Sequence, residues 1–111
     1  MQYLRPFTPP SPAQHEKLTT RLTSANMYHA TSYQRLLHYL TETPTALSAG
    51  DLSAVTNIPL PTTYRALRRL ADRGLVDWYT DKSAVARWYA VRSGHNKNYC
   101  TACNRPYVEH E

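Results

Sequence analysis

The residues with the most distinctive chemistry in this chain lie close together, between positions 64 and 69. Tyr64 and three arginines, Arg65, Arg68 and Arg69, occur there with no acidic residue between them. An arginine guanidinium can bind DNA phosphates or the edge of a guanine, and a tyrosine ring can pack against the methyl group of a thymine. This grouping indicates a DNA-binding surface. The alternative is a solvated basic face on a structural helix, which is the commoner meaning of a single basic helix.

A predicted amphipathic helix carries these residues. Its buried stripe follows a three- and four-residue spacing and comprises Thr63, Leu67, Leu70 and Ala71. Its other face carries Thr62, Arg65, Arg69 and Asp72, with Tyr64 and Arg68 together on one flank. We expect Pro61 to start the helix, since its fixed backbone angle and missing N–H suit the first turn. We expect Gly74 to end it in the left-handed conformation that glycine favours.

A shorter helix is predicted immediately before the basic one, over residues 49–56. Ser48 is its expected N-cap, and Asp51 stands where a capping box usually has Glu or Gln. The segment from Asn57 to Leu60 contains a proline and turns the chain into the basic helix. A short helix, a tight turn and a basic amphipathic helix are the parts of a helix-turn-helix.

Two further helices are predicted nearer the N-terminus. Residues 1–12 contain four prolines and are expected to be an extended, flexible lead-in. A helix is predicted over residues 13–27, and another over 33–43 with Ser32 as its N-cap and Pro44 as its stop. His38 falls off the apolar stripe of that second helix, so we expect it at the surface.

After Gly74 the apolar period changes to two, which is typical of β-strands. Val76 and Trp78 face one way, residues 81–84 form a turn that contains Lys82, and residues 85–91 alternate again. The predicted fold class is α+β, mainly α: a winged helix-turn-helix over residues 13–91, with three to four helices followed by a β-hairpin wing. One core is expected, formed by Leu36, Leu40, Leu52, Val55, Leu67, Leu70 and Val76.

The last segment, residues 92–111, is predicted to be a hinge followed by a C-x-x-C stub. Cys100 and Cys103 have the spacing of two thiolate ligands of a tetrahedral zinc, and His95 is a candidate third ligand. A closed structural site needs four ligands, and the spacing of the other candidates is not distinctive. Two chains could share one zinc through four thiolates, and a bare thiol pair is the alternative.

Composition narrows the class of partner. The 111-residue chain has a net charge of +5 and a pI of about 9.4, which favours an anionic partner. No apolar run has the length of a membrane span and the N-terminus lacks a signal-peptide core, so a cytoplasmic protein without a membrane partner is expected. The chain shows no acid–base pair, glycine-rich phosphate loop or nucleophile constellation, and we therefore do not expect an enzyme.

Several motifs, in this order, resemble those of one family. They are the segment 32–36 (SYQRL), the segment 47–52 (LSAGDL), the segment 60–65 (LPTTYR), the segment 74–76 (GLV) and the C-x-x-C pair behind a hairpin. In this order the chain resembles the ferric uptake regulator (Fur) superfamily of metal-responsive repressors, over about residues 32–103. The resemblance implies a winged-helix DNA-binding domain in which Tyr64 and Arg65 contact DNA.

The resemblance also shows where this chain departs from the family pattern. The family's histidine cluster before C-x-x-C is reduced to His95, and Lys97 stands where a ligand is expected. Tyr89 replaces an acidic ligand, and Ala46 replaces a histidine. Lysine is a poor metal ligand at neutral pH because it must first lose a proton. The rest of the family's dimerisation domain does not follow before Glu111. We therefore expect a degenerate metal-sensing site, with zinc as the candidate metal.

The sequence thus predicts a Fur-like transcriptional regulator that binds double-stranded DNA as a homodimer. The residues expected to contact DNA are Thr62, Tyr64, Arg65, Arg68, Arg69 and Lys82. The alternative is a protein-interaction module that pairs with a full-length regulator and modulates it without reading DNA. Retention of the arginines favours the first hypothesis.

Overall fold

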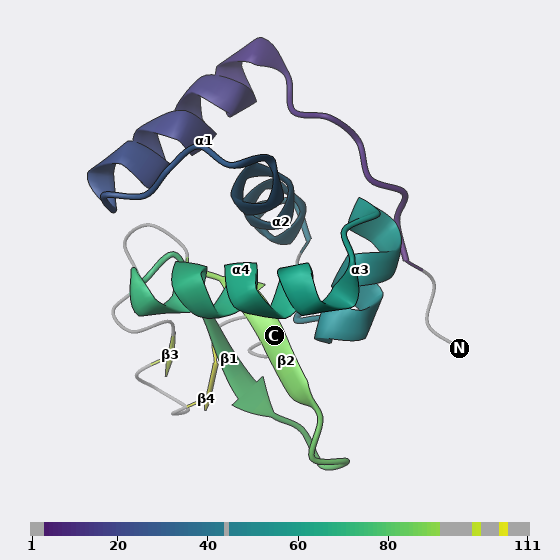
Figure 1. Ribbon diagram of the computed structural model, residues 1–111. Coiled ribbons are helices and arrows are strands. Elements are labelled where there is room, and N and C mark those ends of the chain that lie inside the picture. The colour runs from purple at the N-terminus through teal and green to yellow at the C-terminus, as the bar shows by residue number, and fades with distance from the viewer. Residues whose placement is uncertain (1–3, 44, 92–98, 101–104, 107–111) are drawn as a thin grey trace.

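The computed structural model describes residues 4–43 and 45–91, and the backbone of residues 99–100 and 105–106. It has the winged helix-turn-helix fold that the sequence predicts, with helices packed around a core and a hairpin projecting from them (Figure 1). The elements are α1 (Pro12–Ser24), α2 (Thr31–Thr41), α3 (Ala49–Thr56), α4 (Leu60–Asp72), β1 (Val76–Thr80), β2 (Ala86–Ala90), β3 (Tyr99–Cys100) and β4 (Arg105–Pro106). No helix in the described part of the chain is long and apolar enough to cross a membrane.

The first helix differs from its prediction at both ends. It begins at Pro12 because Ser11 and Gln14 form a capping box, in which each side chain bonds the other residue's backbone N–H. It ends at Ser24, three residues before the predicted Met27. There Asn26 adopts a left-handed φ of 61°, and the backbone folds back in a Schellman motif.

The second helix was predicted two residues too late. It begins at Thr31 and ends at Thr41, and its N-cap is Ala30, which makes no side-chain capping bond; the prediction of Ser32 as the cap was wrong. The prediction of a surface position for His38 was also wrong, because its side chain is buried. The reason is tertiary: His38 Nε2 donates to the carbonyl of Thr8, 3.0 Å away, and the ring of Phe7 packs edge-on against the imidazole.

The N-terminal segment that covers His38 follows α2 closely. Tyr39 donates its hydroxyl to the carbonyl of Arg5 at 2.6 Å, and Arg5 Nη2 donates to the carbonyl of Glu42 at 2.7 Å. The Arg5 guanidinium also lies over the Tyr39 ring. The sequence predicted an extended, flexible course for residues 1–12. Residues 4–11 form no helix or strand, Pro12 is already helical, and these contacts to α2 were not predicted.

The helix-turn-helix is formed by α3 and α4. Helix α3 has the predicted bounds, and Ser48 Oγ accepts from Asp51 N at 3.2 Å. Helix α4 begins at Leu60 rather than at Pro61, so that Pro61 occupies the second helical position. Gly74 ends it as predicted, with a left-handed φ of 77°, and the N–H of the next residue bonds back to the carbonyl of Leu70.

The wing is an antiparallel hairpin joined to the helices by one extra bridge. Val76 pairs with Ala90, and Trp78 pairs with Trp88. Leu47, between α2 and α3, exchanges two backbone hydrogen bonds with Trp88, at 2.8 and 3.0 Å. The hairpin was predicted, but this third strand-like contact was not. It fixes the wing against the start of the helix-turn-helix.

One core joins the helices to the base of the wing. The predicted core residues are buried except Val55, which is partly buried and packs against the core. The side chains with less than 2% exposure include Leu22, Leu36, Leu37, Leu40, Leu47, Leu52, Leu67, Leu70 and Val76. Burial of each leucine contributes roughly 1.5–3 kcal/mol, so the helices depend on this shared core more than on their individual propensities.

Two glycines provide a matched test of this geometry. We expect Gly74→Ala to destabilise the fold by about 1 kcal/mol, because its left-handed backbone disfavours any Cβ even though the space around it is open. Gly50 lies in α3 without positive φ, and we expect Gly50→Ala to be stabilising by about 0.5 kcal/mol. Urea unfolding of both variants measures this. Equal effects of the two changes would contradict it.

Candidate nucleic-acid interface

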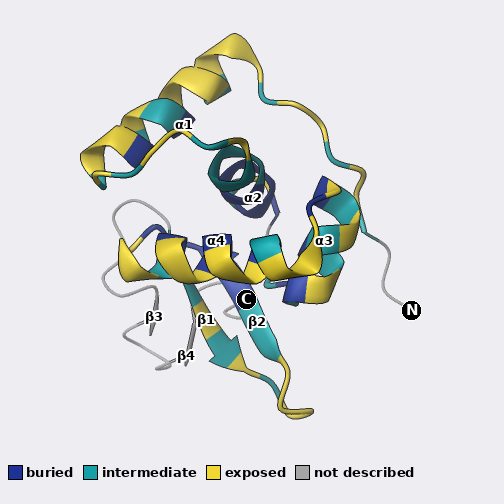
Figure 2. Cartoon of the chain, in the orientation of Figure 1, coloured by how far each residue is buried: buried dark blue, intermediate teal, exposed yellow. Residues whose placement is uncertain are grey.

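Burial of one side of α4 decides which residues its other side presents. Thr63, Ala66, Leu67 and Leu70 are buried, whereas the neighbouring tyrosine and arginines are exposed. In Figure 2, α4 accordingly carries both buried and exposed colours along its length. The predicted stripe included Ala71, which is only partly buried, and missed Ala66. The spacing of this stripe turns the predicted DNA-contact residues toward solvent. The exposed residues of this face include Tyr64, Arg65, Arg68, Arg69 and Arg73.

The arginines of α4 differ from those elsewhere in what they bind. Arg21 donates to the carbonyl of Val91 at 3.0 Å, and Arg35 donates to the carbonyl of Thr56 at 3.1 Å. Burial lowers the pKa of Arg21, which is consistent with a structural position. In contrast, the two later arginines of α4 and the arginine at its C-cap form no hydrogen bond or ion pair within the described residues. These three are Arg68, Arg69 and Arg73.

Arg65, the first arginine of α4, has one weak internal contact. Its Nη2 lies 3.4 Å from the hydroxyl of Thr62, one turn earlier. This distance is at the long end for a hydrogen bond, so little free energy holds the guanidinium in place. Together the α4 arginines are therefore available to an external anion. The other described arginines are engaged in holding the fold.

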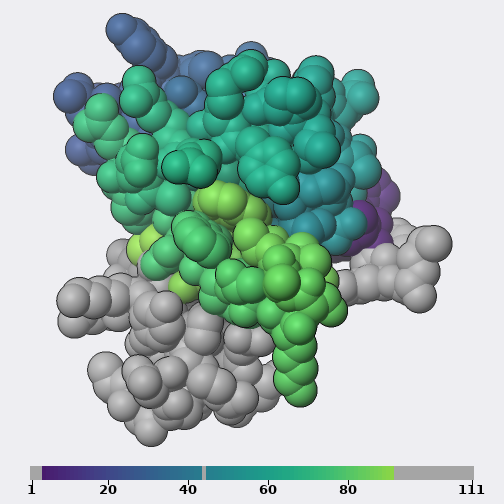
Figure 3. All heavy atoms as spheres, turned by 60° about the horizontal axis from the view of Figure 1, so that its bottom comes forward, coloured from purple at the N-terminus to yellow at the C-terminus, as the bar shows by residue number. Residues whose placement is uncertain are grey.

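A groove between α4 and the wing lies beside this face. It has a volume of about 260 Å³ and is lined by Tyr64, Arg68, Trp78 and Trp88, together with Asp72 and Ala86. Trp78 stacks obliquely on Trp88 with ring centroids 5.9 Å apart, yet remains 47% exposed. Figure 3 shows that α4 and the hairpin meet on one face of the molecule.

Trp78 is a member of this face that the sequence did not identify. Strand alternation correctly placed Trp78 on the same side as the buried Val76. The alternation does not show how far along β1 the core extends, and Trp78 lies beyond the buried part of the strand. An exposed tryptophan next to a basic helix is a signal that could have drawn attention to this position.

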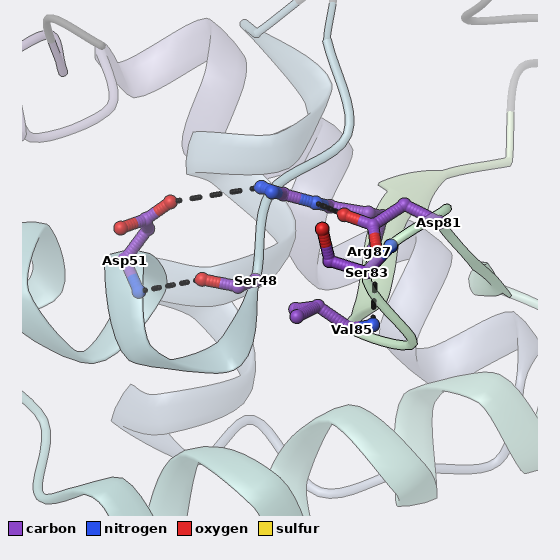
Figure 4. Close-up of polar contacts among 6 residues, drawn as sticks. All are labelled: Ser48, Asp51, Asp81, Ser83, Val85 and Arg87. Atoms are coloured by element: carbon purple, nitrogen blue, oxygen red, sulfur yellow. Dashed lines mark hydrogen bonds and ion pairs between the residues drawn. The ribbon is translucent and has the colours of Figure 1, made fainter. Parts of the chain in front are cut away.

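The wing turn is organised around a single carboxylate. Asp81 accepts from the backbone N–H of Ser83 at 2.8 Å and of Val85 at 3.0 Å, and from Arg87 Nε at 2.9 Å (Figure 4). Arg87 also reaches the carboxylate of Asp51 at 3.9 Å, which links the wing to the start of α3. The hydrogen bond from Val85, followed by that from Arg87, lowers the pKa of Asp81.

The structure brings most of the predicted site residues together. Thr62, Tyr64, Arg65, Arg68 and Arg69 all lie along α4, and Lys82 is exposed in the wing turn. The predicted metal ligands lie elsewhere: Cys103 and His95 are outside the described residues, and Cys100 is described only by its backbone in β3. Within the described part of the chain, no three His, Cys, Asp or Glu side chains gather as a metal site would require.

Comparison with known proteins supports the same architecture. The model of the IclR helix-turn-helix domain matches residues 35–78, less than half of the chain. The solved ferric uptake regulator from Pseudomonas aeruginosa with manganese is 21% identical, with a TM-score of 0.62 over 79% of this chain and 71% of that one. No curated protein sequence matches.

Two other solved structures are also similar. A MarR-family transcriptional regulator from Silicibacter pomeroyi is 26% identical, with a TM-score of 0.56 over 72% of this chain and 53% of that one. The S. aureus MepR–DNA complex is 21% identical, with a TM-score of 0.56 over 71% of this chain and 64% of that one. This chain thus spans less than two thirds of these two relatives.

The chain has the winged-helix fold of the ferric uptake regulators. The resemblance seen in the sequence is therefore confirmed at the level of fold. The MarR-family protein and MepR share this fold with similar TM-scores, so the comparisons establish the winged-helix architecture and do not select one function for it.

The carboxylate in the wing turn gives a prediction about pH. The stability that Asp81 contributes is fully present above the ordinary aspartate range, near pH 4, and is lost as the pH falls through its lowered pKa. We expect Asp81→Asn to lower the Tm at neutral pH and the difference from the parent to close in acid. Thermal melts between about pH 7 and about pH 2 measure this.

The control for that experiment is Asp72→Asn on α4. Asp72 is exposed and makes no ion pair or hydrogen bond in the described part of the chain. Its replacement should leave the Tm close to that of the parent across the same pH range. A Tm difference for Asp81→Asn that stays constant down to the most acid condition would contradict the prediction.

Proposed function

We propose that this protein is a DNA-binding transcriptional regulator that inserts α4 into the DNA major groove. The observation that carries the proposal is the face of α4, where a buried apolar stripe orients arginines that have no strong partner among the described residues. A helix about 10–12 Å across fits a major groove about 12 Å wide. The solved MepR–DNA complex, which shares the fold, supports the same kind of partner.

The proposed contacts divide between reading bases and binding phosphates. Arg65 and Tyr64 lie in the first half of α4, where a recognition helix usually reaches base edges. Arg68 and Arg69, further along the helix, and Lys82 in the wing turn are proposed to neutralise phosphates. Thr62, whose hydroxyl lies close to Arg65, is proposed to help orient that guanidinium.

We propose a homodimer as the DNA-binding form. One winged helix buries little surface on DNA, and two copies related by a two-fold axis read two half-sites. This arrangement also matches the symmetric operators that two-fold dimers require.

The proposed regulator is Fur-like, with a degenerate metal-sensing site. Tyr89, which stands where the resemblance implies an acidic ligand, is 1% exposed in β2. Ala46 and Lys97 replace two further expected ligands, and neither can hold a metal at neutral pH in its ordinary form. Zinc at Cys100 and Cys103, with His95 as a candidate third ligand, is the remaining proposal, and it rests on the sequence.

Replacement of two residues in the first half of α4 tests DNA recognition. We expect Arg65→Ala to weaken specific binding by roughly 1–3 kcal/mol and to relax one position of the site, because a bidentate contact to a guanine would be lost. Tyr64→Ala should reduce the preference for thymine with little change in salt dependence, since its contact is apolar. Binding of selected and unrelated duplexes at several salt concentrations measures both effects.

The matched control removes a positive charge elsewhere. Lys17 is exposed on α1, a different helix, and Lys17→Ala should change specific DNA affinity much less than Arg65→Ala. Melting curves establish that each variant is folded. Folded Arg65→Ala and Tyr64→Ala proteins that bind DNA as the parent does would overturn the proposal. They would favour a protein-interaction module instead.

The zinc proposal has its own test. We expect the purified protein to bind about one zinc through its thiolates, and Cys100→Ser combined with Cys103→Ser to abolish this binding. Metal titration with a colorimetric zinc competitor measures it. Tight zinc or iron binding that survives the double replacement would contradict the prediction and would point to a different site.

A further inference from the structure

A polar hollow lies where the C-terminal ends of α1 and α4 come together, outside the residues assigned above except Arg69. These two helix ends lie on the same side of the molecule, at the left of Figure 1. The hollow has a volume of about 390 Å³. It is lined by Asn26, Met27, Tyr28, Tyr33, Arg69 and Arg73.

Both walls of this hollow are fixed by the same kind of helix ending. Asn26 ends α1 with a left-handed backbone, and Met27 N donates to the carbonyl of Leu22 at 2.9 Å. Gly74 ends α4 in the same way, immediately after Arg73. Schellman motifs satisfy the last helical C=O groups with N–H groups from beyond the helix, and they hold the chain direction there. The positions of Asn26 and Arg73 are therefore set by backbone geometry.

The lining residues carry several hydrogen-bond donors that have no acceptor within the described residues. Arg69 lies in the last turn of α4 and Arg73 is the C-cap four residues later, and neither guanidinium has a hydrogen bond or ion pair among the described residues. Within the same residues, the hydroxyl of Tyr33 and the backbone N–H of Tyr28 also have no acceptor. Tyr28 is 85% exposed, so the hollow is open to solvent.

The charge balance of the hollow favours an anion. Two guanidiniums contribute two positive charges, and the C-terminal ends of α1 and α4 contribute about −0.5 each. Asp72 lies on α4 but does not line the hollow. The sum of these charges at the hollow is about +1. A tetrahedral oxyanion, with several acceptor oxygens, suits two guanidiniums, a hydroxyl and an N–H better than a carboxylate would.

We infer that this hollow binds a phosphate group, and that in the DNA complex it holds a backbone phosphate at the edge of the major groove. Arg73 lies eight residues beyond Arg65, about 12 Å along the helix axis, which is close to the width of the groove. With Arg65 at the bases, Arg73 reaches a phosphate that borders the groove. This inference rests on the proposed function, and it adds Arg73 and Tyr33 to the residues that contact DNA.

The test uses Arg73→Gln and Tyr33→Phe in the full chain, with Lys17→Ala as the charge control. Arg73→Gln should weaken binding of the selected site and of an unrelated duplex by the same factor, at least fivefold at low salt. It should also lower the slope of log K against log salt by about one unit, as expected for one lost phosphate contact. Tyr33→Phe should weaken both duplexes severalfold. Melting curves identify folded variants.

Neutral methylphosphonate substitutions, placed one at a time along the duplex, locate the contact. At one position flanking the groove, the substitution should weaken binding by the parent and have no further effect on Arg73→Gln. If every methylphosphonate weakens the parent and Arg73→Gln equally, the inference is overturned and the proposed function stands. A parent that binds no DNA would overturn both.

The alternative ligand of the hollow is a free phosphate group rather than a phosphate of the DNA backbone. Inorganic phosphate is the probe that distinguishes the two. At constant ionic strength, replacing chloride by phosphate at a few millimolar should leave the Tm of the parent unchanged if the hollow serves DNA alone. A rise in Tm of the parent that is lost in Arg73→Gln, together with an unchanged DNA salt slope in that variant, would overturn the DNA assignment. It would identify a site for a small phosphorylated ligand.

Discussion

Burial of Leu67 and Leu70 fixes the rotation of α4 about its own axis, and the rest of the interface follows from that rotation. Both side chains are 0% exposed. A helix has one side-chain direction every 100°, so anchoring two residues on one side determines where every other side chain points. If α4 turned by half a revolution, its arginines would enter the core, where unpaired charges are costly. The hydrophobic core therefore specifies indirectly which residues α4 exposes to solvent.

The described arginines fall into two groups that differ in their contacts within the protein. Arg21 and Arg35 bind backbone carbonyls that lie far away in the sequence, and Arg87 joins the wing turn to α3 through two aspartates. These contacts hold loops and the wing in place. The arginines of α4 have no comparable partners in the described part of the chain. Net charge alone, at +5, conceals this distinction, since it counts both groups equally.

The wing is held at its middle and its turn by unrelated interactions. At the middle of β2, Leu47 extends the hairpin by a third strand-like contact with Trp88. At the turn, Asp81 gathers two backbone N–H groups and Arg87 around one carboxylate. A two-stranded hairpin is marginally stable alone, so these links give the wing a defined position relative to α4. The exposed Trp78 and Lys82 are positioned by the same framework.

The sequence by itself determined the order of the elements and which residues α4 exposes. Capping residues, a proline-containing turn, Gly74 and the change of period after it are local signals, and local backbone energetics makes them readable. The bounds of α3 and the exposure of Arg65 followed from them. Only the tertiary structure decided the burial of His38, the bridge from Leu47 to Trp88 and the hollow at Arg73. Each of these joins segments that are distant in the sequence, and local patterns carry no information about which distant segment packs against them.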